Sequence, residues 1–270
     1  MILFNESWPH SWEFEHDYPE GADEAFDECV DLYHAGDLEH AEQTLKDILF
    51  VCPDHIDALH HLALVYENTD RSIEAYLCTR EAVRICLEAI PAHFSWLTEQ
   101  ILWGEHNNRP FLRAYHSLAL HHLRRQNTKD ASDILARLVS TNPNDNLGAR
   151  YVLMTCLLND GNWETAIKLT KQYPDDTGPE IAYSKVIALL HLGCHNEAKE
   201  NLKWAIQQNR KVAIELLKTQ HTRPEAAFPG YTTLGGEEEA FIYWEQNSIH
   251  WSKDSEAFKL LHELMQKNSL

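Results

Sequence analysis

A period of thirty-four residues constrains this chain more than any other feature. The phrase Gly-x-x-x-x-Ala, followed twelve residues later by Pro, first occurs as Gly36, Ala41 and Pro53. Ala75 lies 34 positions after Ala41. Later partial copies are Ala131 with Pro143, Gly161 with Ala166, and Gly193 with Ala198. A repeat of this length predicts stacked helix–turn–helix units, in which each unit packs only on its neighbours.

Small and apolar residues within each copy follow the i, i+3, i+4, i+7 spacing of one helix face. In the first copy we expect helices over 22–35 and 39–51, with Cys29 facing Ala41 and Leu45. Two antiparallel helices can cross closely only where small side chains meet, and larger apolar residues then fill the groove beside them. The pattern therefore predicts pairs of antiparallel helices.

Turn and capping residues agree with this interpretation. Glycine at 36, 161 and 193 lies where the first helix of a pair must end, as a glycine C-cap would. We expect Asp and Asn side chains to cap the helices that follow. The candidates are Asp37, Asn162 and Asn196 for second helices, and Asp54 and Asn144 for the next first helices.

These residues make the chain resemble the tetratricopeptide repeat family over about 22–209, in about five units. The resemblance implies an all-α, right-handed α-helical solenoid. The second unit departs from the family pattern, because Thr69-Asp70 replaces the glycine and its second helix continues to about Ile90. We expect an extra helix over 93–105, with Trp96 and Trp103 on one face. The second helix of the fourth unit should end at Tyr173-Pro174.

The segments outside the array form the rest of the predicted domain plan. Residues 1–21 are an aromatic and acidic extension, whose run Trp8–Phe14 we expect to fold back over the groove or cap the first unit. Docking to another chain and disorder remain alternatives. Residues 210–270 should form an atypical helical cap, with helices near 211–219, 237–247 and 254–267, because the last unit of a solenoid must shield its apolar face.

Scattered positions in this last region resemble the end of the suppressor-of-tumorigenicity-seven family. They are the run Asn209–Leu217, the run Gly236–Tyr243, Trp251, and Leu260-Leu261. The resemblance implies a shared helical architecture and supplies no activity. That family has membrane segments, which this sequence lacks.

The first helices of a tetratricopeptide array line its concave surface, so residues of these helices are the candidates for partner binding. They are Phe26, Tyr33, His34, His60, Leu64, Arg113, His116, Leu120, Arg124, Tyr151 and Tyr183. Some family members hold a chaperone carboxylate with Lys and Asn, but Phe26 and Val30 occupy those positions here, which argues against such binding.

The mixture of apolar groove residues with Arg113 and Arg124 suits a peptide with apolar and acidic anchors. Pairing of these arginines with the acidic first units, or with Asp145, is the alternative.

Charge and motifs exclude other classes. Residues 1–70 carry a net charge of −17 out of −19 for the whole chain, which disfavours nucleic acid and anionic membranes as partners. The six cysteines lack zinc-site spacing and read as free thiols. Neither the 17 histidines nor the many carboxylates form a metal or catalytic motif, so we expect no metal, no cofactor and no catalytic residue.

We therefore expect a cytoplasmic, non-enzymatic adaptor or scaffold that binds a protein or peptide. One alternative is self-association into a homodimer through the terminal helices, with Phe241, Trp244 and Phe258 as candidates. The other is an unrecognised hydrolase or metal-binding protein that uses His and carboxylates.

Overall fold

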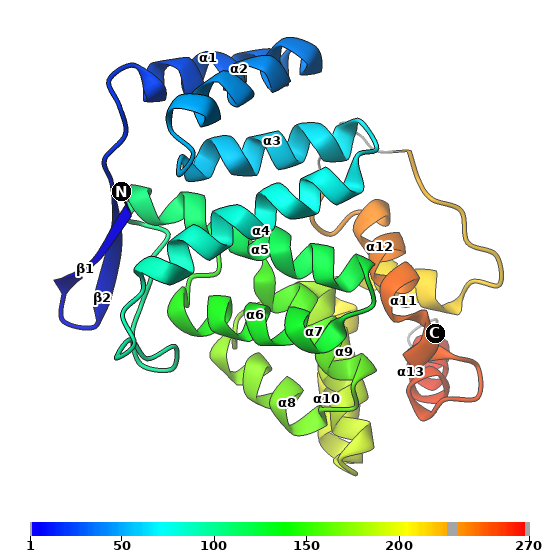
Figure 1. Ribbon diagram of the computed structural model, residues 1–270. Coiled ribbons are helices and arrows are strands. Elements are labelled where there is room, and N and C mark those ends of the chain that lie inside the picture. The colour runs from blue at the N-terminus through cyan, green and yellow to red at the C-terminus, as the bar shows by residue number, and fades with distance from the viewer. Residues whose placement is uncertain (1, 226–231, 268–270) are drawn as a thin grey trace. The chain divides into compact units, whose positions relative to one another are not determined.

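The computed structural model describes residues 2–225 and 232–267. The chain divides into two compact units, Met1–Arg150 and Tyr151–Leu270. The predicted boundaries at 21/22 and 209/210 do not coincide with this division, which falls within the repeat array. Antiparallel helix pairs build both units (Figure 1), which confirms the predicted all-α helical repeat of the solenoid type.

Unit 1 begins with two strands and continues with helices, namely β1 (Ile2–Trp8), β2 (Ser11–His16), α1 (Ala22–His34), α2 (Leu38–Val51), α3 (Ile56–Asn68), α4 (Ser72–Ala89), the 3-10 helix η1 (His106–Asn108), α5 (Arg109–Arg124) and α6 (Thr128–Thr141). Helix α7 (Ala149–Asn159) starts at the boundary. Unit 2 continues with α8 (Trp163–Gln172), α9 (Pro179–His191), α10 (His195–Gln208), α11 (Arg210–Leu217), α12 (Glu237–Asn247), η2 (Ser248–Trp251) and α13 (Glu256–Lys267).

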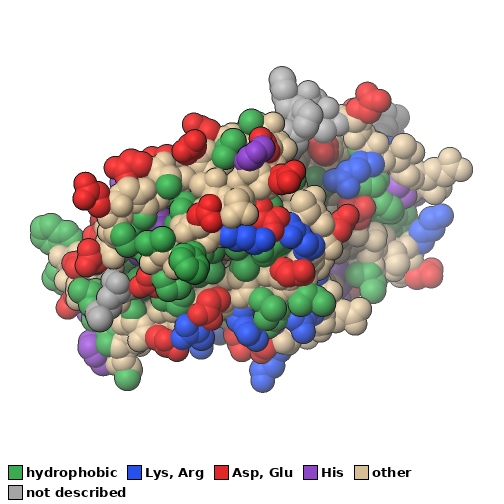
Figure 2. All heavy atoms as spheres, turned by 45° about the horizontal axis from the view of Figure 1, so that its top comes forward, with side chains coloured by type: hydrophobic (Ala, Val, Ile, Leu, Met, Phe, Trp, Pro, Cys, Tyr) green, Lys and Arg blue, Asp and Glu red, His purple; other side chains and the backbone are tan. Residues whose placement is uncertain are grey.

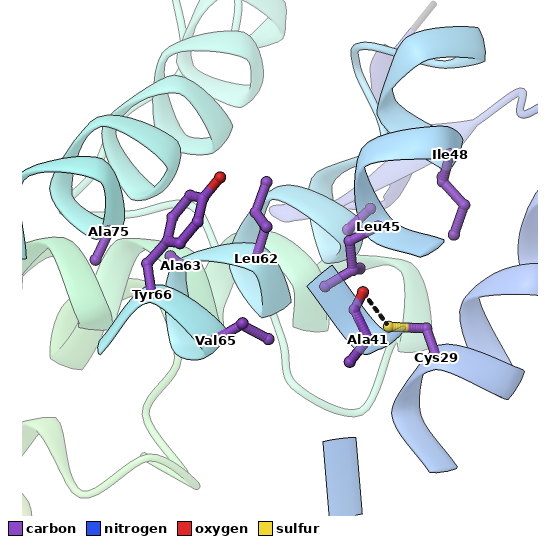
Figure 3. Packing of buried hydrophobic residues seen from close by; sticks show 10 residues of the cluster. Cys29, Ala41, Leu45, Ile48, Leu62, Ala63, Val65, Tyr66 and Ala75 are labelled. Carbon is purple, nitrogen blue, oxygen red and sulfur yellow. Dashed lines mark hydrogen bonds between the residues drawn. The ribbon is translucent and has the colours of Figure 1, made fainter. Parts of the chain in front are cut away.

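Fully buried alanines hold the helix pairs together. In each of α2, α4, α6, α8 and α10, the alanine at the equivalent repeat position has no exposed surface; these are the alanines at 41, 75, 131, 166 and 198. Figure 3 shows the first of these sites, where Leu45 and Ile48 lie near Ala41 and the Cys29 thiol donates to the Ala41 carbonyl at 3.5 Å. A larger side chain at such a site would push the two backbones apart.

Left-handed residues end α1, α3, α5, α7 and α9, whether or not they are glycine. Gly36 has φ +80° and Gly193 has φ +74°, as the sequence predicts for glycine C-caps. Asp70 (φ +58°) and Gln126 (φ +60°) take the same conformation in the units that lack the glycine. The amide of the residue after the left-handed one closes each turn, as in Arg71 N to Tyr66 O at 2.8 Å.

Helix capping agrees with the sequence in part. Asp37 caps α2 through the His40 amide, as predicted. The caps predicted at 54 and 144 are wrong by one residue, because His55 accepts from the Ala58 amide and Asp145 accepts from the Ala149 amide at 2.8 Å. Residue 196 lies inside α10, so the cap predicted there is wrong as well.

The extra helix predicted over 93–105 is absent. Its backbone is instead fixed by distant partners, since the Ile101 amide donates to the Thr141 carbonyl at 2.8 Å and the Trp103 amide to the Asn142 side chain at 3.1 Å. Trp96 packs on Tyr115, whereas Trp103 lies under the Arg109 guanidinium, so the two indoles do not share a helix face. Such hydrogen bonds replace those that a helix would make.

The N-terminal extension is an antiparallel hairpin, which the sequence did not predict as a strand pair. It packs on the segment between α4 and α5 (Figure 1) rather than over the groove or on the first repeat. Phe4, Trp12 and Phe14 contact Phe94 and Phe111 with ring centroids 5.1–5.7 Å apart. The Trp12 amide donates to the Gln100 carbonyl at 2.9 Å, which extends the hairpin by one bridge.

Of the last three helices, α11 packs on α12 and α13, and these two helices pack on α9. All three occur within two residues of the predicted ranges at both ends. Tyr243 is their centre, because its hydroxyl lies 3.4 Å from Ser184 of α9 and accepts from the Trp251 indole at 3.1 Å. Residues 226–231, between α11 and α12, lie outside the described residues.

Replacement of Asp70 by glycine should stabilise the protein, because a non-glycine residue in the left-handed region is strained. We expect Asp70→Gly to raise the free energy of unfolding by up to about 1 kcal/mol, and Gly36→Ala to lower it by about 1 kcal/mol. No atom lies within 4 Å of a Cβ added at Gly36, so only backbone strain is tested there. Urea denaturation measures both, and equal stability of the two variants would contradict the account.

Removal of the Asn108 side chain should loosen the hairpin. This fully buried amide accepts from the Phe14 amide and donates to the Trp12 and Leu102 carbonyls at 3.0–3.1 Å. Asn108→Ala leaves those groups unpaired, at a cost of about 2–4 kcal/mol. The matched control is Asn107→Ala at an exposed site, for which calorimetry should show a loss below about 1 kcal/mol.

Candidate protein-binding surface

The first helices of three successive repeats lie in sequence in unit 1, where α3 contacts both α1 and α5 directly. Two ion pairs join α3 to α5 near their ends, Asp57 with Arg113 at 2.5 Å and Glu67 with Arg124. The Asn68 amide of α3 donates to the Tyr33 hydroxyl of α1 at 2.9 Å. We call the surface that these three helices share the A-helix wall.

Apolar and aromatic side chains on this wall are neither fully buried nor free. Phe26, Tyr33, Leu64, His116 and Leu120 are half-buried, and His34 is exposed. Phe26 meets the edge of the His61 ring with centroids 4.9 Å apart. With Arg113 and Arg124, which are also partly exposed, the structure brings eight of the eleven predicted binding residues to the wall with part of their surface open to solvent.

The arginines predicted to bind an acidic partner are engaged within the protein. Arg113 and Arg124 pair with the acidic residues of α3, as the alternative interpretation of the sequence holds. Arg150 pairs with Asp145 at 2.8 Å, and Arg109 donates to the Trp103 carbonyl at 3.0 Å. A basic centre made of Arg113 and Arg124 is thus not available without breaking ion pairs.

Histidines lie along α3 and α5 between the residues that form the two ion pairs. His60 is buried, against the prediction that it lines the groove, and neither its Nδ1 nor His116 Nε2 has a hydrogen-bond partner among the described residues. Burial lowers the pKa of His60 to about 3, with further lowering from His61. Burial also lowers the pKa values of His61 and His116. These imidazoles are therefore neutral in the folded protein at neutral pH.

In unit 2 the corresponding surface is covered by the chain itself. Tyr183, predicted to bind a partner, has no exposed surface, and its hydroxyl donates to the Asn209 carbonyl at 2.6 Å. The rings of Tyr243 and Trp251 lie 5.8 and 6.1 Å from its ring. The prediction for Tyr183 is wrong, because the C-terminal helices occupy the face of α9 that a partner would need.

Other aromatic candidates in unit 2 are also engaged. Tyr151 is half-buried, and its hydroxyl donates to Asp176 at 3.3 Å. Phe241 is buried, and Trp244 stacks on His221 with centroids 3.6 Å apart, so these two do not form the exposed dimer surface that the sequence suggested. Phe258 is half-buried.

A pocket that sequence reasoning missed lies at one end of α3, α4 and α5, with a volume of about 760 Å³. We call it the Tyr76 pocket. Its lining residues are Glu67, Ser72, Ile73, Tyr76, Leu77, His121, Arg124 and Arg125. Of these only Arg124 was predicted. Ile73 and Leu77 could have been found, because they lie off the stripe of α4 that carries Ala75, Thr79 and Ala82.

Hydrophobic side chains lie beside basic ones on the face that Figure 2 shows, amid many acidic residues. Among residues 2–225 and 232–267, no group of three His, Cys, Asp or Glu residues could hold a metal ion. All six cysteines are free thiols, and four of them are buried. No described helix combines the length and the apolar character needed to span a bilayer.

Comparison with solved structures supports the fold. A tetratricopeptide repeat protein, YrrB, superposes with a TM-score of 0.50 at 19% identity, over 69% of this chain and 85% of that chain. MamA superposes with a TM-score of 0.50 at 18% identity, over 75% and 99% of the two chains. A double mutant of MamA gives 0.51 at 15% identity, over 72% and 97%. No curated protein sequence matches.

Acid should destabilise the protein through the buried histidines. In the unfolded chain His60 takes up a proton near pH 6.5, but in the folded protein only near pH 3, so the unfolded state binds more protons between these values. The stability that neutral His60 contributes is therefore fully present above about pH 6.5 and is lost progressively as the pH is lowered toward 3. Urea unfolding of His60→Leu should depend less on pH between about 5 and 6.5 than that of the exposed control, His106→Leu. Equal pH dependence of the two would contradict this.

The C-terminal resemblance to the suppressor-of-tumorigenicity-seven family is not supported. The family that matches is described as transcriptional repressor TCF25, and its match extends over residues 20–269, through the repeats and the C-terminal helices alike. Because this match includes nearly the whole chain, the protein belongs to the TCF25 transcriptional repressor family.

Proposed function

We propose that this chain is a non-enzymatic adaptor, whose A-helix wall in unit 1 binds a segment of another protein. The observation that carries the proposal is the line of half-buried apolar side chains, Phe26, Tyr33, Leu64 and Leu120, which recurs on α1, α3 and α5. A partner segment could bury the remaining surface of these side chains at little entropic cost, since packing already restricts them. Aromatic and aliphatic anchors of this kind supply most of the energy in helix and peptide recognition.

The ion pairs support the same proposal. Asp57–Arg113 and Glu67–Arg124 fix the spacing of α3 and α5, so the wall is formed before a partner arrives. A rigid surface loses less conformational entropy on binding than a flexible one. The related fold in YrrB, whose description gives it an unusual peptide-binding site, is consistent with this use of the fold.

The family description suggests a context for the binding. A repressor whose first 70 residues carry a net charge of −17 would act through other proteins rather than by holding DNA, because these residues repel the phosphate backbone. We therefore propose that the chain contributes to repression by binding a protein partner, with no catalytic residue and no cofactor of its own.

Site-specific crosslinking tests the wall. A photoreactive phenylalanine analogue at Leu64 or Leu120 should crosslink a partner in native lysate, and the same analogue at Gln43 or Ala136, which are exposed on α2 and α6, serves as the control. We expect crosslinked species at the wall positions at least about tenfold above the controls, because only the wall buries apolar surface against the partner. Equal crosslinking at all four positions would contradict the proposal.

A further inference from the structure

The Tyr76 pocket lies next to the A-helix wall, because Glu67 and Arg124 belong to both. Three helices form it, namely the end of α3, the start of α4 and the end of α5. Tyr76 is in ring contact with His121 and His122 at centroid distances of 5.8 and 6.3 Å. Helices thus hold the aromatic centre of the pocket in place.

Apolar side chains of α4 extend from this centre into solvent. Ile73 is 74% exposed and Leu77 is 43% exposed, one turn apart on the same side of the helix as Tyr76. Burial of such side chains against a ligand is favourable, because it removes apolar surface from water. Together with the hollow beside them, they offer a place for one apolar side chain of a ligand.

The charges at the pocket are positive and only partly compensated. The Arg125 guanidinium lies 4.3 Å from the centre of the Tyr76 ring, and that of Arg80 lies 5.8 Å from it. Neither arginine forms an ion pair with any described carboxylate, whereas Arg124 pairs with Glu67. In a chain of net charge −19, two uncompensated guanidinium groups beside an exposed apolar pair form a local site for negative charge.

We propose that the Tyr76 pocket binds an acidic peptide segment, with an apolar side chain against Ile73, Tyr76 and Leu77 and carboxylates on Arg80 and Arg125. This rests on the proposed function, since the segment would continue from a partner on the adjoining wall. It also assigns the acidic anchor of the partner to arginines other than Arg113 and Arg124, which are already paired.

Charge favours a peptide over nucleic acid at this pocket. A tyrosine beside arginines could stack a base. A strand of nucleic acid, however, carries a charge at every phosphate and would extend over the acidic remainder of unit 1, which includes the net −17 of residues 1–70. A peptide needs only one or two carboxylates close to the apolar anchor.

Selection from a phage library of random dodecapeptides on the full chain tests the proposal. We expect the selected clones to be enriched in Asp or Glu within two positions of Leu, Ile, Phe or Met. Arg80→Glu/Arg125→Glu should weaken their binding by about tenfold or more, and Ile73→Ser/Leu77→Ser by a similar factor, since both sets lie at the surface and contact the ligand directly. Circular dichroism should show unchanged helicity for both variants.

Lys129→Glu/Lys168→Glu is the matched control, because it changes the net charge equally at two exposed positions outside the pocket. Its binding should equal that of the wild type. Clones without acidic enrichment, or an equal loss in the control, would overturn the proposal. Tighter binding of a single-stranded oligonucleotide that depends on Arg80 and Arg125 would also overturn it, in favour of nucleic acid.

Crosslinking and peptide binding together distinguish failure of the pocket proposal from failure of the wall proposal. If the crosslinks from Leu64 and Leu120 persist in Arg80→Glu/Arg125→Glu while the selected peptides do not respond to it, then the pocket proposal fails and the wall proposal stands. If those crosslinks are absent in the wild type but acidic clones still bind at the pocket, then the wall proposal fails alone.

Discussion

The close contact of two antiparallel helices at a buried alanine is the interaction on which the rest of this structure depends. Alanine at 41, 75, 131, 166 and 198 allows each second helix to approach its first helix, and none of the five has any exposed surface. The short turn between the helices follows, and a left-handed residue closes it at 36, 70, 126, 161 and 193. In unit 1 this geometry sets α1, α3 and α5 side by side and so creates the wall.

The same kind of helix face meets different surroundings in the two units. In unit 1, Phe26 and Leu64 keep part of their surface, because only neighbouring helices and two ion pairs lie beside them. In unit 2, Tyr183 and Ile187 of α9 are buried, because α12, η2 and α13 return to pack on them. In unit 2 the helices of the chain itself cover the apolar face. In unit 1 we propose that a partner covers it.

Much of the fold could be predicted from the sequence, since period, helix faces and glycine caps all act over fewer than forty residues. The segment over 90–108 could not, because its amides are satisfied by residues such as His10 and Thr141 that lie far away in the sequence. Tyr183 and Phe26 were both predicted to bind a partner from their positions within a repeat. Tyr183 is buried, however, by helices about sixty residues later in the sequence. The repeat pattern did not indicate Tyr76, because it assigns binding residues to first helices and Tyr76 lies on α4, a second helix.

The central claim is that unit 1 presents a preformed binding wall. Hydrogen–deuterium exchange of the full chain, with and without the partner recovered by crosslinking, tests it most directly, because bound surfaces lose exchange locally. The account predicts slower exchange in α1, α3 and α5 and in the first turns of α4, with α2 and α6 unchanged. Protection confined to α2 and α6, or to unit 2, would contradict it.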